Sequence, residues 1–361
     1  MSRDLPIGAL LESADAAPAH LIAPKLNRHT FWCGQSGSGK TYALGILLEQ
    51  VLLQTRLPLV VLDPNSDFVR LGEIRDDAAP DVAATLRSRD VRVFRAGEGE
   101  RPLHVRLLGM PVRTRAAILG IDPALDAELY NEMLRVQSEA ALIGQGNLLA
   151  YLRSQDSEIR HRLALRLENL GMAEWELWAW GERAVTDDID EDPDATIVDL
   201  GGFDTQAEFR AAALGVLEHL WMHREERRPR LIVIDEAHNL CSPEPVDAVH
   251  ALLTERIVQI AAEGRKFGLW LLLSTQRPSK VHPNALSQCD NLALMRMSST
   301  RDLDELAGVF GYAPESLLQR SPGFAQGQAL FAGGFIDQPS LVQMGARLTH
   351  EGGIDVPVPL R

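Results

Sequence analysis

A glycine-rich segment that ends in lysine and threonine is the first place where residue types indicate chemistry. The residues GQSGSGKT follow the apolar stretch HTFWC and precede a run with helical apolar spacing. Such a loop lets successive backbone N–H groups turn inward and form a nest for phosphate oxygens at a helix N-terminus. The lysine then reaches the β- and γ-phosphates, and the threonine hydroxyl binds Mg²⁺. We therefore expect ATP and Mg²⁺ at Gly34, Gln35, Ser36, Gly37, Ser38, Gly39, Lys40 and Thr41.

Two adjacent acids follow a second apolar stretch. Residues 231–234 are expected to form a central strand, and Asp235 and Glu236 stand at its carboxyl end. The first acid of such a pair binds the water shell of Mg²⁺, and a second carboxylate can polarise an attacking water. We predict that Asp235 binds the metal and that Glu236 activates water. A small-molecule kinase needs no water activator, so the pair favours an ATP-hydrolysing protein over that class.

An uncharged amide stands at the end of a third apolar strand. Residues 269–273 are apolar, and Gln276 follows a serine and a threonine. Ligands of a doubly wound sheet bind beyond the carboxyl ends of its strands. If this strand lies beside the one that ends in Asp235, Gln276 emerges next to the γ-phosphate. An amide there both donates and accepts hydrogen bonds without adding charge, so we expect Gln276 to sense the γ-phosphate.

Strands and helices alternate along most of the chain. Strands are expected at 29–34, 57–63, 91–97, 196–202, 230–238, 269–275 and 291–297, with helices at 40–54, 207–226 and 246–264. This alternation predicts an α/β fold with a doubly wound, mainly parallel sheet. We expect residues 1–30, which carry three prolines, to be an extended lead-in and residues 31–361 to form the domain. The turn-rich segment from residue 299 onward should close an edge of the sheet.

Strand signals vanish between about residues 111 and 185, where the pattern predicts a helical insertion. Helices are expected at 113–120, 126–143 and 157–180. Trp175, Trp178 and Trp180 could stack on bases, but packing within the insertion is the favoured interpretation. Six acids stand between Asp187 and Asp194. A solvated loop is favoured there over a metal site.

The composition limits the class of protein. The chain has 361 residues, of which 45% are apolar and 24% charged, an ordinary globular mixture. A formal charge of −14 argues against a surface that coats nucleic acid indiscriminately, although a local basic channel needs only about six phosphate contacts. Three scattered cysteines indicate neither zinc nor disulfides. Without a secretory signal or an apolar run of about 18 residues, the protein is expected to be soluble and cytoplasmic, with no membrane partner.

Several segments together resemble the HerA/FtsK superfamily of hexameric P-loop translocases, and its HerA-like branch most. They are LNRHTFWCGQSGSGKT, VVLDPNSDF, LIVIDEAHNL and AAEGRKFGLWLLLSTQRPSKVHPNALSQCDNLALMRM, which span about residues 22–297. The resemblance implies a RecA-like P-loop NTPase core in a homo-oligomeric ring, usually of six subunits. It also implies ATP at the subunit interfaces and double-stranded DNA threaded through the centre.

Ring ATPases complete each nucleotide site with an arginine of the neighbouring subunit, whose planar cation stabilises charge in the transition state. By resemblance, Arg28 is the first candidate for this catalytic role. Arg265, in the segment EGRK, is the second, either within its own subunit or across the interface. Arg296 and Arg301 are weaker candidates.

Two departures from the family pattern bear on function. Asp63 matches a family position near the site, but Ser66 and Asp67 replace the glycine and glutamate that usually follow. Only 33 residues precede Gly34, too few for the N-terminal β-barrel of HerA proteins. Ring formation is then expected to rely on the core, the insertion, the C-terminal segment or a partner protein.

Two functions remain open. The first is an ATP-driven DNA translocase or helicase-like motor that could work with a nuclease. The second is a regulatory ring ATPase that scaffolds or gates an effector, such as a nuclease in anti-phage defence, with little translocation of its own. The charge of −14 and the missing barrel favour the second, whereas the intact catalytic set keeps the first ahead.

Overall fold

The computed structural model describes residues 4–13, 15–97, 99–139 and 148–353. Within these residues, 11 strands form one sheet in the order β2-β1-β11-β10-β9-β3-β8-β7-β4-β6-β5. The strands from β9 to β5 in this order are parallel, and the remaining pairs are antiparallel. The predicted mainly parallel α/β sheet is therefore confirmed. The strands are β1 (Asp4–Leu10), β2 (Pro18–Ile22), β3 (His29–Cys33), β4 (Leu59–Asp63), β5 (Val91–Arg95), β6 (Ala195–Asp199), β7 (Arg230–Ile234), β8 (Leu269–Thr275), β9 (Cys289–Met295), β10 (Gln328–Gly333) and β11 (Ser340–Met344).

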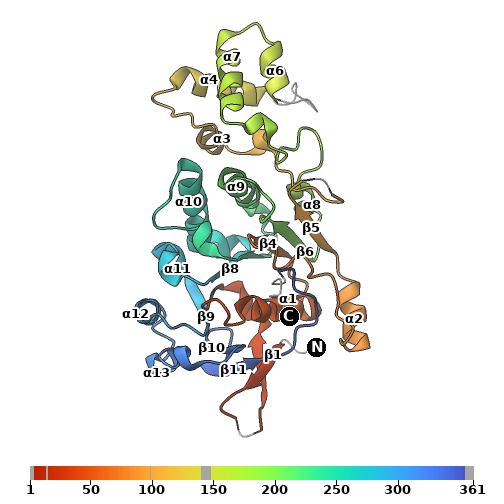
Figure 1. Cartoon of the computed structure of the whole chain (residues 1–361), viewed down its shortest axis with the longest axis vertical. Helices are drawn as coiled ribbons and strands as arrows, with labels where there is room; N and C mark the ends of the chain where they lie inside the picture. The colour runs from red at the N-terminus through yellow and green to blue at the C-terminus, as the bar shows by residue number, and fades with distance from the viewer. Residues whose placement is uncertain (1–3, 14, 98, 140–147, 354–361) are drawn as a thin grey trace, which may run out of the picture.

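Helices cover both faces of the sheet (Figure 1). Side chains alternate across a strand, so the neighbours Phe31 and Trp32 belong to different hydrophobic clusters. Helix α1 packs in the Trp32 cluster, and α9 and α10 pack in the Phe31 cluster. The helices are α1 (Lys40–Gln54), α2 (Pro80–Arg87), α3 (Val112–Ile118), α4 (Ala127–Ser138), α6 (Leu148–Ser154), α7 (Glu158–Asn169), α8 (Val185–Asp190), α9 (Gln206–Met222), α10 (Ala248–Glu263), α11 (Pro283–Leu286), α12 (Thr300–Val309) and α13 (Glu315–Leu318).

The strand order brings the chemically interesting segments to one edge of the sheet. Strand β3 lies beside β8, β8 beside β7, and β7 beside β4, all parallel. Parallel neighbours end at the same edge. The segments that follow these four strands carry the glycine-rich loop, Gln276, the Asp235–Glu236 pair and Asp63, and they therefore meet there.

The first residues form a hairpin that joins the sheet, which differs from the extended lead-in expected for residues 1–30. Strand β1 pairs with β2 and also with β11, which is antiparallel to it. Leu5, Ile7 and Leu21 are buried in the same cluster as α1. The prolines in this segment suggested that it has no regular strands. Pro6, however, stands beside a register shift of the β1–β2 pair, and Pro18 is the first residue of the outermost strand. Proline is tolerated at such positions.

The two C-terminal strands belong to the antiparallel part of the sheet, but they do not form its edge. Strands β10 and β11 lie between β9 and the β1–β2 hairpin. The segment after residue 299 was expected to close an edge. It extends the sheet beyond β9, but the hairpin occupies the outermost place.

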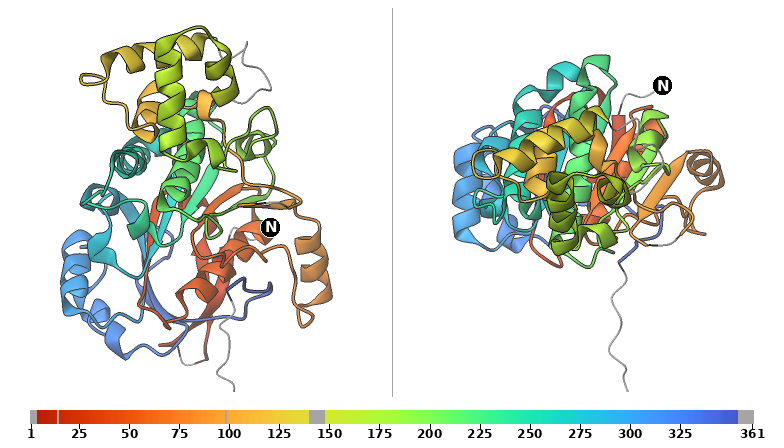
Figure 2. Two further views of the ribbon diagram at one scale, coloured as in Figure 1. Left: turned by 45° about the horizontal axis from the view of Figure 1, so that its top comes forward. Right: turned by 90° about the horizontal axis from the view of Figure 1, so that it is seen from above.

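Helices α3, α4, α6 and α7 lie between β5 and β6 in the sequence and gather at one end of the molecule, beyond α9 and α10 (Figures 1 and 2). The helix expected at 126–143 is α4, which ends at Ser138, and residues 140–147 lie outside the described residues. The Nη1 and Nη2 atoms of Arg113 on α3 each lie 2.7 Å from a carboxylate oxygen of Glu255 on α10. This bidentate pair helps to join the insertion to the core.

The expected helix at 157–180 is too long. Helix α7 ends at Asn169, and Gly171 has a φ of +67°, which glycine adopts without strain. The tryptophans follow in irregular structure, where the rings of Trp175 and Trp178 stack with centroids 5.6 Å apart. Trp178 is buried and its Nε1 donates to the Met172 carbonyl at 2.9 Å. Packing within the insertion is therefore confirmed for Trp178.

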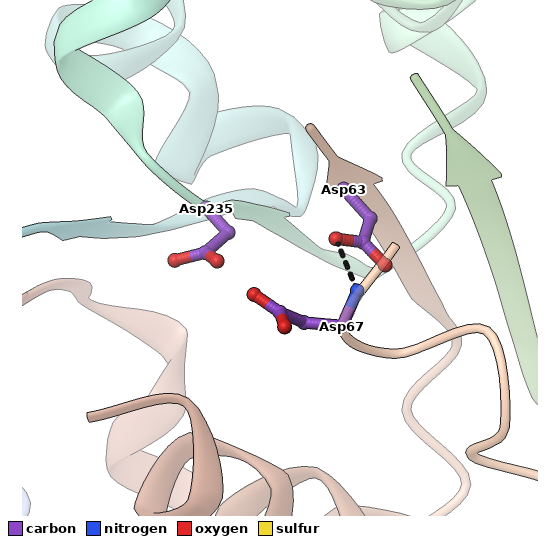
Figure 3. Close-up of side chains that lie close together, drawn as sticks. All are labelled: Asp63, Asp67 and Asp235. Carbon is purple, nitrogen blue, oxygen red and sulfur yellow. Dashed lines mark hydrogen bonds between the residues drawn. The ribbon is translucent and has the colours of Figure 1, made fainter. Parts of the chain in front are cut away.

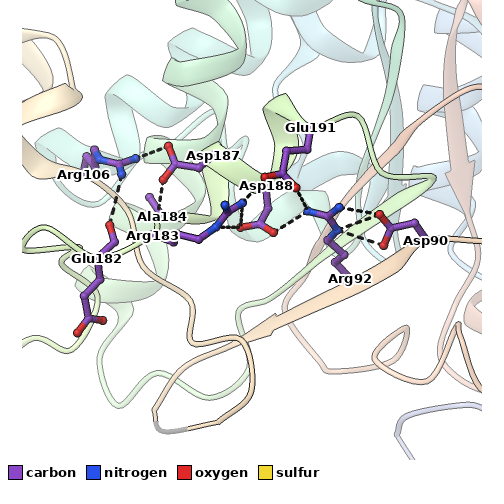
Figure 4. A network of polar contacts seen from close by, with 9 residues as sticks. All are labelled: Asp90, Arg92, Arg106, Glu182, Arg183, Ala184, Asp187, Asp188 and Glu191. Carbon is purple, nitrogen blue, oxygen red and sulfur yellow. Dashed lines mark hydrogen bonds and ion pairs between the residues drawn. The ribbon is translucent and has the colours of Figure 1, made fainter.

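The acidic run is partly helical and ion-paired, so the prediction of a solvated loop was wrong. Residues 185–190 form α8, and its acids meet arginines from β5 and the insertion (Figure 4). Arg92 Nη1 lies 2.7 Å from Asp188 Oδ1 and 2.5 Å from Glu191 Oε2. Arg106 Nη1 lies 2.6 Å from Asp187 Oδ1. These ion pairs hold α8 against the edge of the sheet.

Candidate nucleotide-binding and hydrolysis site

The glycine-rich loop joins β3 to α1, so its backbone turns at the N-terminus of a helix of 15 residues. Gly37 and Gly39 have φ values of +73° and +86°, in the left-handed region that favours glycine. Gly34 has no room for a side chain, because a Cβ there would lie 2.7 Å from the Cβ of Met295. The loop has the backbone that a phosphate-binding nest requires.

A second layer of contacts holds this loop in shape. The Gln35 N–H donates to the Arg296 carbonyl at 2.8 Å, and Gln35 Oε1 accepts from the Ser298 N–H at 3.0 Å. Arg296 Nη2 donates to the Gly37 carbonyl at 2.8 Å. Arg296 therefore supports the loop of its own chain, and this contact argues against its candidacy as an arginine that acts in a neighbour. Arg301 is exposed at the start of α12.

Lys40 is buried between Asp235, the predicted metal ligand, and Glu236, the predicted water activator. Its Nζ lies 2.8 Å from Asp235 Oδ1 and 3.2 Å from Glu236 Oε1. It also donates to Ser274 Oγ at 3.0 Å. Burial alone would lower the pKa of the Lys40 ammonium, but the charges of Asp235 and Glu236 outweigh it and raise that pKa. The charged lysine offsets the negative charge of the acids at the end of β7.

Glu236 is held by contacts to both of its carboxylate oxygens. Besides the contact of Oε1 with Lys40, Oε2 lies 3.2 Å from His238 Nδ1 and accepts from the Gln276 N–H at 3.4 Å. Burial opposes ionisation, but the hydrogen bond to His238 and the charge of Lys40 outweigh it and lower the pKa of Glu236 to about 2. Glu236 is thus a carboxylate near neutral pH, as a proton acceptor for water must be.

Gln276 emerges where the strand order places it, beside Glu236. Strand β8 pairs in parallel with β7, with Leu273 opposite Ile234. Ser274, for which the sequence indicated no role, donates to Asp235 Oδ1 at 2.6 Å. Gln276 lines the same cleft as Lys40.

This cleft has a volume of about 800 Å³, within the usual range for ligand sites. Its floor is formed by the glycine-rich loop and Glu236, and one wall is formed by residues at the ends of β10 and β11. The Gly327 N–H donates to the Ser38 carbonyl at 3.0 Å, which ties that wall to the loop. Sequence reasoning missed the wall because no motif marks it. The lining residues are Gln35, Ser36, Gly37, Gly39, Lys40, Thr41, Tyr42, Asn65, Asp67, Glu236, Gln276, Gln326, Gly327, Gln343, Met344, Gly345, Glu351 and Gly353.

Three carboxylates converge next to the cleft (Figure 3). One oxygen atom from each of Asp63, Asp67 and Asp235 lies within 4.8 Å of the other two. Burial, opposed by hydrogen bonds from the Phe68 and Asp67 N–H groups, raises the pKa of Asp63 to about 7. Burial and the charge of Asp235 raise the pKa of Asp67 to about 6. Asp235 Oδ2 is buried and has no hydrogen-bond partner among the described residues.

This group has the donors that a hard divalent cation prefers, namely carboxylate oxygens with an unused lone pair. The residues therefore fit the expectation of Mg²⁺ at Asp235. Asp67 is a site residue that the sequence left in doubt, because it stands where the family pattern has glutamate.

A buried ion pair supports α1 from behind the cleft. Arg347 Nε lies 3.6 Å from Glu49 Oε1, and both side chains are fully buried. Glu49 also accepts from the N–H groups of Leu348 and Thr349 at 2.9 and 2.8 Å. The guanidinium packs on Gly45, where a Cβ would lie 2.6 Å from Arg347 Cζ. The C-terminal segment is thereby fixed against the helix that carries Lys40.

Arg28 and Arg265 lie together at the opposite edge of the sheet. Arg28 precedes β3, Arg265 precedes β8, and both pair with Asp290 at the start of β9. Six residue steps of β3 separate Arg28 from Gly34, which is about 20 Å at roughly 3.3 Å per residue. Neither arginine reaches the glycine-rich loop of its own chain. The option that Arg265 acts within its own subunit is therefore inconsistent with the structure.

No helix among the residues that the structure describes is long and apolar enough to cross a membrane.

Comparisons with known proteins agree on one family. The family model described as "Helicase HerA, central domain" matches residues 5–214. The DNA double-strand break repair helicase HerA of Pyrococcus furiosus is 24% identical over 94% of this chain and 69% of its own length. The enzyme of the same name from Sulfurisphaera tokodaii is 30% identical over 32% of this chain. That alignment spans only 23% of the relative's length.

Solved structures share the fold at low sequence identity. VirB4 of Thermoanaerobacter pseudethanolicus superposes with a TM-score of 0.65 at 16% identity, over 96% of this chain and 97% of that one. The plasmid coupling protein TrwB, in complex with ADP and Mg²⁺, gives a TM-score of 0.61 at 12% identity, over 96% of both chains. Since the HerA model covers more than half of the sequence, the chain belongs to the HerA family of HerA/FtsK-type P-loop ATPases.

Proposed function

We propose that this protein is a ring-forming, Mg²⁺-dependent ATPase that moves along double-stranded DNA, with six subunits in the ring. The observation that carries the proposal is the contact of Lys40 with both Asp235 and Glu236, where Lys40 and Glu236 line one cleft and Asp235 is buried behind them. Lys40 would leave the acids and bind the β- and γ-phosphates. Glu236 would then accept a proton from the water that attacks the γ-phosphorus, and ADP and phosphate would leave.

The carboxylates support the dependence on Mg²⁺. Thr41 and Asp235 would hold the ion, with Asp67 beside them. When bound, the ion neutralises phosphate charge that a single lysine cannot balance. Asp235 would thus exchange its contact with Lys40 for the metal.

The position of the two arginines supports a site shared between subunits. Arg28 and Arg265 are exposed and lie at the edge of the sheet opposite the loop, so in a head-to-tail ring they would face the nucleotide of the next subunit. A heterologous interface of this kind closes into a ring when the rotation allows it. Arg28 is our first candidate for the arginine that acts in the neighbour, and Arg265 the second.

The proposed action on DNA is supported by the similarity of this chain to known proteins. A family model named for a helicase and relatives named as DNA repair helicases support a motor on DNA. The charge of −14 requires that any DNA-binding surface be local.

The second candidate function is a regulatory ring that gates an effector such as a nuclease, for example in anti-phage defence. The observation behind it is that the described part of the insertion exposes large apolar side chains, which a protein partner would cover. The exposed fraction is 88% for Leu125 and 47% for Leu165.

ATP hydrolysis with and without duplex DNA separates the two functions. A motor should be stimulated strongly by DNA, and the stimulation should fall steeply with salt because phosphate contacts release counterions. Glu236→Gln is the control that removes turnover by this site. If the rate of ATP hydrolysis is the same with and without DNA at every salt concentration, but changes when an effector protein is added, the motor function would be rejected and the regulatory ring supported.

A further inference from the structure

A histidine lies close to Glu236, on the turn that follows the Asp235–Glu236 pair. His238 lies on the short turn after β7, and its side chain is 12% exposed. Its Nδ1 faces two oxygens at once. Glu236 Oε2 is 3.2 Å away and Thr275 Oγ1 is 3.0 Å away. A single nitrogen thus stands between the carboxylate at the end of β7 and the last residue of β8.

The partners decide which ring nitrogen carries the proton. A carboxylate only accepts hydrogen bonds, so an unprotonated Nδ1 would direct its lone pair at a negative charge. Nδ1 therefore donates, and Glu236 Oε2 is the stronger acceptor because it is charged. Thr275 Oγ1 is the competing acceptor, and it also accepts from the Arg277 N–H at 3.0 Å.

The backbone of Glu236 is strained. Glu236 has φ and ψ of +43° and +48°, a left-handed conformation that costs a non-glycine residue energy. Its side chain must be held in place by neighbours. These neighbours are Lys40, His238 and the Gln276 N–H. When Lys40 turns to the phosphates, His238 is the side chain that remains, next to the backbone N–H of Gln276.

We propose that His238 is the positioning residue of the hydrolysis site, which holds the Glu236 carboxylate and links it to the end of β8. This inference rests on the proposed ATPase function. With nucleotide bound, the Nδ1–H bond fixes Glu236 toward the water. When Glu236 shifts, the proton of Nδ1 turns to Thr275, whose hydroxyl also binds the segment that begins with Gln276 and Arg277. The state of the catalytic carboxylate is thereby transmitted to the segment that follows β8.

Two substitutions separate this role from simple packing. His238→Ala removes the donor, whereas His238→Asn keeps a side-chain N–H close to the position of Nδ1. Removal of the donor should lower kcat by about 10- to 100-fold, less than the full contribution of a general base. The affinity for a fluorescent ADP analogue should stay within about twofold, because His238 does not line the cleft. His238→Asn should restore most of kcat.

The Glu236→Gln background gives the decisive comparison. If His238 acts only through the Glu236 carboxylate, His238→Ala should slow single-turnover hydrolysis by less than about twofold in that background. Interacting residues are non-additive in this way. A loss that multiplies fully in the double variant would overturn the proposal, as would an unchanged kcat in His238→Ala or a loss of kcat that His238→Asn does not restore.

A second measurement does not depend on turnover. In protein without added nucleotide, the urea midpoints of His238→Ala, Glu236→Gln and the double variant should be non-additive, because His238 Nδ1 lies 3.2 Å from Glu236 Oε2 and the two side chains are in direct contact. Additive midpoints would reject the link. A parent protein that hydrolyses no ATP would reject the proposed function instead, and the midpoints would still decide the role of His238.

Discussion

Replacement of Lys40 with alanine should destabilise the protein even when no nucleotide is present. The ammonium lies 2.8 Å from Asp235 and 3.2 Å from Glu236, its own side chain is 7% exposed, and that of Asp235 is fully buried. Alanine would leave both carboxylates without this cation. Removal of one partner from a buried ion pair costs about 3–5 kcal/mol. Since Glu236 retains His238, we expect the free energy of unfolding to fall by about 4 kcal/mol.

Urea denaturation of the nucleotide-free protein, in buffer that contains EDTA, measures this loss. Lys280→Ala is a matched control, because Lys280 is 58% exposed and lies 3.8 Å from the exposed Glu244. Its effect should stay within about 1 kcal/mol. ATP at 100 times its dissociation constant should stabilise the parent by about 2.7 kcal/mol and should leave Lys40→Ala unchanged. A loss no greater than that of the control would refute the buried position of Lys40 between the acids.

Three further predictions concern single positions. Glu236→Gln should bind ATP like the parent but hydrolyse it at least about 100-fold more slowly in single-turnover assays. Asp63→Asn should flatten the dependence of stability on pH, because burial raises the pKa of Asp63 from an ordinary 3.8 to about 7. Between these two pH values, and without metal, the folded protein binds a proton that the unfolded chain has released. The free energy of unfolding of the parent therefore falls by about 1.4 kcal/mol for each pH unit as pH rises. Gly45→Ala should cost about 1–3 kcal/mol in urea denaturation, because its Cβ would lie 2.6 Å from Arg347 Cζ.

Each of these has an outcome that contradicts it. Parent-like turnover in Glu236→Gln would remove the water-activating role. An Asp63→Asn curve that runs parallel to the parent between pH 4 and 7 would show that another group carries the proton. Gly308→Ala is the control for Gly45→Ala, since its Cβ would meet nothing within 4 Å in α12; it should stabilise the protein by up to about 1 kcal/mol. Equal effects at the two glycines would contradict the packing of Arg347.

The sequence predicted the fold class and the neighbourhood of the site because both depend on local patterns. Continuous apolar strands end in polar residues, and a parallel sheet brings those ends to one edge. That logic puts Gln276 near Glu236 on the condition that the two strands are neighbours, and the pairing of β7 with β8 confirms the condition. It cannot give the pairing itself, which decides that Ser274 binds Asp235.

The missed features depend on contacts between distant segments. Asp67 approaches Asp235 only because β4 lies beside β7, and no spacing within LDPNSDF indicates this. The cleft wall at Gly327 is positioned by a hydrogen bond to Ser38, nearly three hundred positions earlier. The opening hairpin was missed for a different reason. The prolines in it suggested irregular structure, yet Pro6 and Pro18 occupy the positions where a sheet tolerates them.

The central claim is that a nucleotide bound by one subunit is hydrolysed with an arginine of the next. Mixing two inactive variants tests it most directly. Arg28→Ala lacks the arginine, Glu236→Gln lacks the proton acceptor, and each keeps the other group. In mixed rings, sites that combine Glu236 of one subunit with Arg28 of its neighbour are complete. We predict that an equimolar mixture hydrolyses ATP faster than either variant alone. A mixture whose rate equals the average of the two variants, although subunits exchange, would contradict the account.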